Sequence, residues 1–138
     1  MMNLRALAMA AGTGILLAAS GVATAKADDR LGIRVSGPEG SCANKSVEND
    51  HVKVCFAAYG EWLYVKDKAE DGRSAYGQIL VPDVKDPCRN KFGVGTWAKC
   101  NYSVPEYLFV MYQGYTKDNE GIFNPKHDIT DLIQEEAS

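Results

Sequence analysis

The chain has 138 residues, of which 46% are hydrophobic and 24% are charged, and its formal net charge is −3. This length suits a single domain with a modest core. The acidic balance argues against a nucleic-acid partner, which would require a basic face, and against adsorption to an anionic membrane surface.

The first residues predict export. Residues 1–5 form a short n-region with one positive charge, residues 6–25 are uncharged, and small residues that match an A-x-A cleavage pattern follow. We expect cleavage after Ala27, so that residues 1–27 are a signal peptide. A retained membrane anchor is the alternative, but glycines and a serine interrupt the apolar run.

Residues 28–138 are then expected to form a single secreted β-domain with its core at about 47–116. No later segment approaches the roughly 18 apolar residues of a membrane helix, so we expect no membrane association once the signal is removed. No internal repeat, linker or low-complexity block divides this part of the chain. We expect an extracellular monomer.

Short runs with an apolar residue at every second position recur along the domain, and turn residues separate them at intervals of about ten residues. The expected strands are 31–35, 51–59, 61–66, 74–81, 95–103 and 106–115. This spacing predicts an all-β fold, a small antiparallel β-sandwich of immunoglobulin-like or similar type. Residues 128–137 are expected to form either a short C-terminal helix, with Asp128 as its N-cap, or a last strand.

All four cysteines, Cys42, Cys55, Cys88 and Cys100, follow the predicted cleavage site. An even number of cysteines in an exported chain indicates two disulfides. Three pairings are open, and the grouping into an early and a late pair favours Cys42–Cys55 and Cys88–Cys100. Zinc is the rival interpretation, but the spacings C-x12-C and C-x11-C lack the short knuckle of structural zinc sites.

A cluster of acids, Asp67, Glu70 and Asp71, stands at a turn dipeptide Asp-Gly. An EF-hand loop that begins at Asp67 would need oxygen ligands where Ala69 and Gln78 stand, so the calcium pattern is poor. The cluster is more typical of a turn between two strands. A loose calcium site on these three acids is the alternative, and we expect no other metal and no cofactor.

Catalytic residues are not apparent. The chain has two histidines, His51 at the start of a predicted strand and His127 in a polar segment, and no Gly-x-Ser-x-Gly elbow. With the cysteines committed to disulfides, no thiol nucleophile remains. We therefore expect a protein that is not an enzyme.

Aromatic and large apolar side chains are the more informative group. In the run 106–115, Tyr107, Phe109 and Met111 share one face of a predicted strand. Phe92 and Trp97 lie between the last two cysteines, where a disulfide would pre-organise an exposed loop. These five residues are the candidate binding surface. The alternatives are that the rings fill the core and that the segment between the cysteines is a plain hairpin.

Two blocks of the sequence carry a resemblance. The run VCFAAYGEWLYVKDKAEDGRSAYG, followed by GVGTWAKCNYSVPE, resembles a group of small secreted actinobacterial proteins of unassigned function, which show CF…YG…VxDxxADGxSA and GTW…CNY blocks. This chain reads AEDG where those proteins read ADG. The resemblance implies a secreted, disulfide-linked β-fold and supplies no catalytic residues.

The leading hypothesis is a secreted, non-enzymatic domain that recognises an extracellular protein or a polysaccharide of the cell envelope. One alternative is an inhibitor or antibacterial effector that presents the segment from Cys88 to Cys100. A small hydrolase is the other.

Overall fold

The computed structural model describes residues 29–39, 42, 45–84, 86–106, 109–118 and 129–136. The predicted signal peptide at 1–27 lies outside the described residues, and so do Tyr107, His127 and Asp128. The described part of the chain contains no α-helix. It accordingly offers no apolar helix of the length needed to cross a bilayer.

The described residues form ten strands. In chain order these are β1 (Arg30–Leu31), β2 (Ile33–Val35), β3 (Val47–Glu48), β4 (Val52–Ala57), β5 (Trp62–Asp67), β6 (Ser74–Ile79), β7 (Cys88–Asn90), β8 (Trp97–Asn101), β9 (Phe109–Lys117) and β10 (Ile133–Glu136). Sheet A has the order β1-β7-β6-β9-β10, and sheet B has the order β2-β8-β5-β4-β3.

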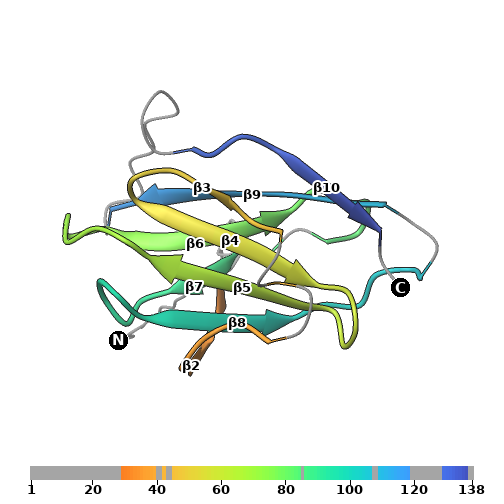
Figure 1. Cartoon of the computed structure of the whole chain (residues 1–138), viewed down its shortest axis with the longest axis horizontal. Coiled ribbons are helices and arrows are strands. Elements are labelled where there is room, and N and C mark those ends of the chain that lie inside the picture. Colours follow the sequence, from red (N-terminus) through yellow and green to blue (C-terminus); the bar gives the residue numbers. More distant parts are fainter. Residues whose placement is uncertain are drawn as a thin grey trace, which may run out of the picture.

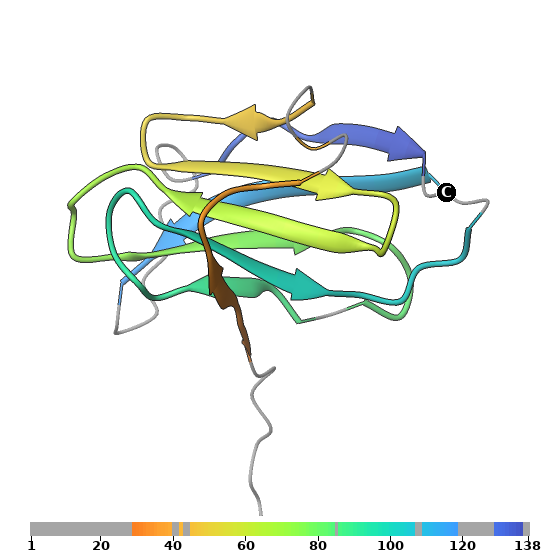
Figure 2. The same cartoon turned by 60° about the horizontal axis from the view of Figure 1, so that its bottom comes forward.

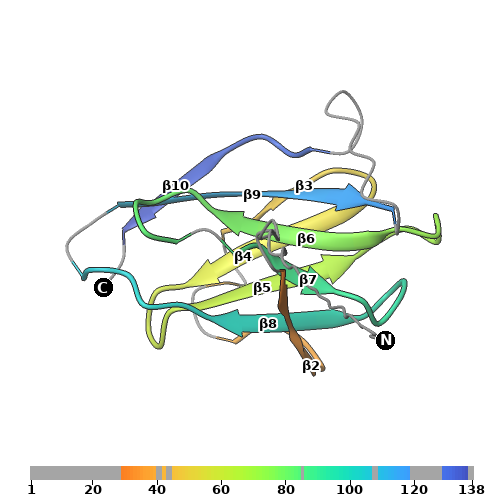
Figure 3. The same cartoon turned by 180° about the vertical axis from the view of Figure 1, so that it is seen from behind.

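The two sheets stack face to face as a β-sandwich. Figure 1 shows β4, β5 and β8 of sheet B in front, and Figure 3 shows the molecule from behind, with β6, β7 and β9 of sheet A nearer. All neighbouring strands are antiparallel except β1 and β7, which are parallel. The prediction of an all-β antiparallel sandwich is confirmed.

The core between the sheets follows from the alternation of apolar residues. On β4, Val52, Val54 and Phe56 point inward and are fully buried. They meet Val110 and Tyr112 of β9, and the Phe56 and Tyr112 ring centroids are 6.3 Å apart. Because successive side chains of a strand point to opposite faces, these buried rows also decide which side chains face outward.

Two glycines allow the sheets to approach closely. Gly77 of β6 is paired with Gly114 of β9 across sheet A. A Cβ atom at Gly77 would lie 2.7 Å from a Val65 methyl, and one at Gly114 would lie 2.5 Å from a Val54 methyl. The bare backbone at both positions is therefore what lets the valines of sheet B pack onto sheet A.

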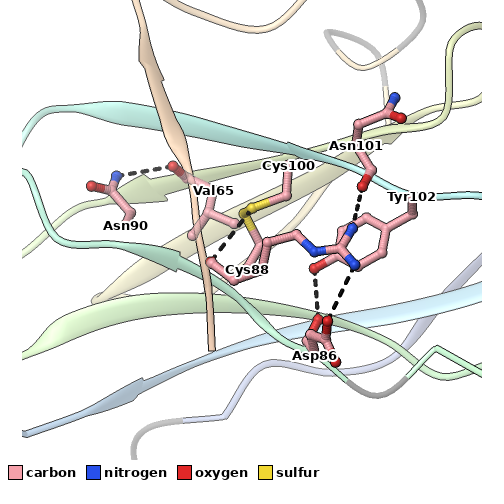
Figure 4. Close-up of a disulfide and its surroundings, with 8 residues drawn as sticks. Val65, Asp86, Cys88, Asn90, Cys100, Asn101 and Tyr102 are labelled. Atoms are coloured by element: carbon pink, nitrogen blue, oxygen red, sulfur yellow. Dashed lines mark hydrogen bonds and ion pairs between the residues drawn. A yellow bond between two sulfur atoms is a disulfide. The ribbon is translucent and has the colours of Figure 1, made fainter. Parts of the chain in front are cut away.

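Both predicted disulfide pairings, Cys42–Cys55 and Cys88–Cys100, are confirmed. The alternative of a plain hairpin between these cysteines is wrong, whereas the connection 91–96 that the second disulfide closes is largely exposed. Cys88 lies on β7 in sheet A and Cys100 on β8 in sheet B, so this buried bond joins the two sheets (Figure 4). Only residues 91–96 connect the two strands.

The C-terminal segment is a strand, so the alternative of a helix at 128–137 is wrong. Gly114 and Thr130 exchange two hydrogen bonds of 2.8 Å, which align the segment along β9. Ile133 then stands opposite Tyr112 and packs against the core. Pairing with the edge of β9 satisfies backbone groups that a helix would have to satisfy within itself.

A strand is expected at 31–35, and the structure divides this segment between the two sheets. In Figure 2 the segment that carries β1 and β2 crosses from one sheet to the other. β1 pairs with β7 of sheet A, and β2 pairs with β8 of sheet B. A Cβ atom at Gly32, which joins the two strands, would lie 2.7 Å from the Ala98 Cβ, so the crossing needs a residue without a side chain.

Candidate binding surface on the outer face of sheet A

The outer face of β9 carries the most exposed of the predicted binding residues. Val110 and Tyr112 point into the core, so Phe109 and Met111 point outward, with exposed fractions of 60% and 37%. Phe109 and Met111 therefore do not fill the core, whereas Tyr107 lies outside the described residues. The same alternation turns Gln113, Tyr115 and Lys117 outward. We call the outward side chains of β9 (Phe109, Met111, Gln113, Tyr115 and Lys117) together with Gln78 of β6 the β9 face.

A stacked pair of tyrosines supports one end of the β9 face. Tyr76 of β6 and Tyr115 of β9 are cross-strand partners, with ring centroids 5.2 Å apart and ring planes 2° from parallel. The Lys117 Nζ lies 4.7 Å from the centroid of the Tyr76 ring. This arrangement combines aromatic stacking with a cation–π contact.

Asp29 holds Tyr76, the β6 member of that pair, in place. The Tyr76 hydroxyl donates to the Asp29 carboxylate at 3.1 Å, and Lys117 forms an ion pair with the same carboxylate at 3.8 Å. Burial, and then the charge of Asp29, raise the pKa of Tyr76 to about 12. The phenol therefore stays protonated and keeps donating this hydrogen bond at physiological pH.

A shallow hollow of about 320 Å³ adjoins the tyrosine pair. Gln78, Gln113, Tyr115, Lys117 and Ile129 line it. The side-chain amides of Gln78 and Gln113 lie 3.4 Å apart on neighbouring strands, and each amide can both donate and accept hydrogen bonds. The lining therefore combines an aromatic ring, an apolar side chain and directional polar groups, which is the usual composition of a ligand site.

The other two candidate residues lie elsewhere. Trp97 is half-buried on the outer face of sheet B, where it packs beside the Cys42–Cys55 disulfide. Phe92 is half-buried in the connection 91–96, and its backbone N–H donates to Asn90. The five predicted residues therefore do not form one surface.

The acidic cluster of Asp67, Glu70 and Asp71 lies at a turn, and two of its carboxylates accept backbone N–H groups of that turn. One Asp67 oxygen accepts the Ala69 N–H, and one Asp71 oxygen accepts the Arg73 N–H, as in a turn. Burial raises the pKa of Asp67. Glu70 is exposed. Within the described ranges no group of three His, Cys, Asp or Glu residues is placed to hold a metal ion, so the calcium alternative gains no support.

His51 meets a carboxylate that is distant in sequence. Its Nδ1 lies 3.2 Å from Asp71 Oδ2, and the Asn49 side chain accepts the His51 N–H at 2.8 Å. A histidine–carboxylate pair is two-thirds of a hydrolytic triad. However, among the described residues no hydroxyl hydrogen-bonds the His51 ring, and neither His51 nor Asp71 lines the hollow beside Tyr115. Its evident role is to hold the 67–72 turn against the start of β4.

Sequence reasoning missed the polar half of the β9 face. Gln113, Tyr115 and Lys117 continue the alternation that begins at Phe109, so extending the period of two would have found them. The contribution of Gln78 and Ile129 depends on which strands pair, and no local pattern shows that.

Comparison of the chain with known protein families, with curated proteins and with solved structures finds no match. The resemblance to small secreted actinobacterial proteins therefore stays a prediction. The function has to be argued from the surface itself.

Proposed function

We propose that this chain is a secreted, non-enzymatic domain that recognises an extracellular protein or an envelope carbohydrate through the β9 face. The observation that carries the proposal is the adjacency of exposed Phe109 and Met111 to the tyrosine-lined hollow along one strand. Single exposed apolar residues are ordinary, whereas apolar residues grouped beside a polar rim are typical of interaction sites.

The physical basis for binding is a rigid and amphipathic surface. β9 is held between β6 and β10, so its outward side chains stand at fixed spacing. The tyrosine pair is already ordered by Asp29 and Lys117 in the free protein. A ligand would consequently lose little free energy in ordering this surface.

The two disulfides support a location outside the cytoplasm. Both cysteine pairs are bonded, and no cysteine in the described chain is free. Such bonds persist in oxidising compartments and are rare where thiols are kept reduced. This agrees with the proposed removal of residues 1–27 during export and with the extracellular ligand.

The proposal can be tested by measuring retention of ligands on the immobilised protein. Wild type and the variant Phe109→Ser/Met111→Ser are compared for capture from culture supernatant and from solubilised cell envelope. Because clustered apolar residues supply most of the binding energy of an interface, we expect the variant to bind at least about tenfold more weakly.

Tyr59→Ser is the matched control, because Tyr59 is 93% exposed and lies in the turn between β4 and β5. It should bind like wild type. Equal binding by the double variant and wild type, or an equal loss in the control, would overturn the assignment of the β9 face.

A further inference from the structure

Three lysines point outward from neighbouring strands of sheet B. Lys53 of β4 and Lys66 of β5 stand directly opposite each other, and Lys99 of β8 stands opposite Tyr64, two residues before Lys66. Figure 1 shows these three strands side by side at the front of the molecule. Buried residues flank each lysine along its strand, so all three side chains face away from the core. We call Lys53, Lys66 and Lys99 the sheet B lysines.

The sheet B lysines outnumber the carboxylates beside them. Within the described part of the chain, β2, β4, β5 and β8 turn no acidic side chain outward. Glu48 on the edge strand β3 stands opposite Lys53, and its carboxylate accepts a hydrogen bond of 2.6 Å from Lys68. That bond lowers the pKa of Glu48, and the charges of Lys53 and Lys66 lower it further. One carboxylate is therefore shared among three ammonium groups.

This arrangement carries a cost while no anion is bound. Like charges that stand directly opposite each other on antiparallel strands destabilise a sheet, and Lys53 and Lys66 form such a pair. Exposed Glu39, whose charge acts on Tyr64, is a second acid near the face. Positive charge nevertheless stays in excess here, although the net charge of the chain is −3. An anionic group is therefore the complementary ligand chemistry.

Aromatic rings hold two of the ammonium groups in place before a ligand arrives. The Lys99 Nζ lies 4.1 Å from the centroid of the Trp62 ring, and the Lys66 Nζ lies 5.8 Å from that of the Trp97 ring. Both distances are in the range of cation–π contacts. The two lysines consequently lose less side-chain freedom when they bind an anion.

The chemistry of the face favours a linear phosphodiester chain. Cβ atoms of opposed residues are about 5 Å apart and those of diagonal neighbours about 7 Å, so the three lysines suit a polymer with repeated charges better than a single anion. The sheet B lysines include no guanidinium, whose planar fork matches a carboxylate, whereas a lysine binds phosphate as a point charge. The ammonium groups over Trp62 and Trp97 occupy ring faces on which the bases of a nucleic acid would stack.

We propose that the sheet B lysines bind a linear polyol phosphate, a polymer with one phosphodiester in each repeat. Successive phosphates pair with Lys53, Lys66 and Lys99, and the polyol between them carries no base that must stack. This face is on the opposite sheet from the β9 face and is independent of it.

Titration calorimetry of the full chain with synthetic poly(glycerol phosphate) at several salt concentrations tests this proposal. A single-stranded phosphodiester chain releases about 0.7 counterion for each phosphate that is neutralised, so three contacts should give a slope of roughly −2 in log K against log salt. Lys53→Gln and Lys66→Gln should each weaken binding about fivefold at low salt and reduce the magnitude of the slope by about 0.7.

Lys91→Gln is the matched control, because it removes the same charge from an exposed residue of the connection 91–96. It should leave binding within about twofold of wild type, and so should Phe109→Ser/Met111→Ser, which separates this site from the β9 face. Absence of binding to poly(glycerol phosphate), or an equal loss in Lys91→Gln, would overturn the proposal. Equal binding of poly-L-glutamate would refute the phosphodiester assignment, and equal binding of oligothymidylate would refute the preference for a polyol.

Discussion

Substitution of Gly114 by alanine tests how closely the two sheets must approach. The Gly114 φ angle lies outside the left-handed region, so alanine can adopt the backbone conformation. Its Cβ, however, would lie 2.5 Å from Val54 Cγ2 and 3.2 Å from both methyls of Val52. The first distance is about 1 Å shorter than an ordinary contact between carbon atoms.

The magnitude follows from overpacking of a dense core. Forcing an additional methyl into a packed interior costs about 1 to 3 kcal/mol. Alanine also reduces the conformational entropy of the unfolded chain, which offsets roughly 0.4 to 1 kcal/mol. We therefore expect Gly114→Ala to lower the free energy of unfolding by about 1 to 2 kcal/mol. Gly37→Ala is the control, because a Cβ there meets nothing within 4 Å.

Equilibrium urea unfolding of four variants with the disulfides intact measures this effect. Val54→Ala alone should cost roughly 2 kcal/mol, from lost burial and the cavity left behind. In Gly114→Ala/Val54→Ala the new methyl occupies part of that cavity. The double variant should therefore lose about 2 kcal/mol rather than the sum of about 3 to 4. Additive losses, or a Gly114→Ala variant as stable as wild type, would refute the close approach.

Three further predictions concern the core and its titration. Cys88→Ala/Cys100→Ala should lower the free energy of unfolding by about 3 kcal/mol or more, since the bond closes a loop and joins the sheets; a change below about 1 kcal/mol in urea unfolding would contradict this. Asn90→Ala should cost about 3 kcal/mol, because it leaves buried backbone groups without partners; thermal melting as in wild type would contradict it. Burial raises the pKa of Glu135, which accepts from the Tyr112 hydroxyl. The folded state then holds this proton more tightly than the unfolded state. The contribution of Glu135 to the free energy of unfolding is therefore fully present below the ordinary carboxyl pKa and is lost as the pH rises through the raised pKa. Melting temperatures from pH 4 to 7 should accordingly fall for wild type relative to Glu135→Gln, and a constant difference across this range would contradict the raised pKa.

Much of the sandwich was predictable because its central strands alternate strongly. The alternation of apolar residues in β4 and β9 can be read directly from the sequence. In the structure it packs Val52, Val54 and Phe56 of β4 against Val110 and Tyr112 of β9. The cysteine pairing was also predictable from spacing alone. These features need no knowledge of which strands are neighbours.

The missed features depend on tertiary contacts. β7 has three residues and buries the polar Asn90 beside Cys88, so no apolar alternation marks it. The contact of His51 with Asp71 arises because the start of β4 lies beside the turn that follows β5. Val35 stands opposite Trp97 only because β2 pairs with β8. None of these pairings is visible in a short window of sequence.

Photo-crosslinking from the β9 face tests the central claim most directly. p-Benzoyl-phenylalanine is placed at position 111 in one protein and at position 59 in another, and both are irradiated in the presence of cell envelope and culture supernatant. Met111 lies on the β9 face, whereas Tyr59 is exposed in the turn after β4. We predict a light-dependent adduct of higher mass from position 111 alone. The absence of an adduct there, or equal adducts from both positions, would contradict recognition through the β9 face.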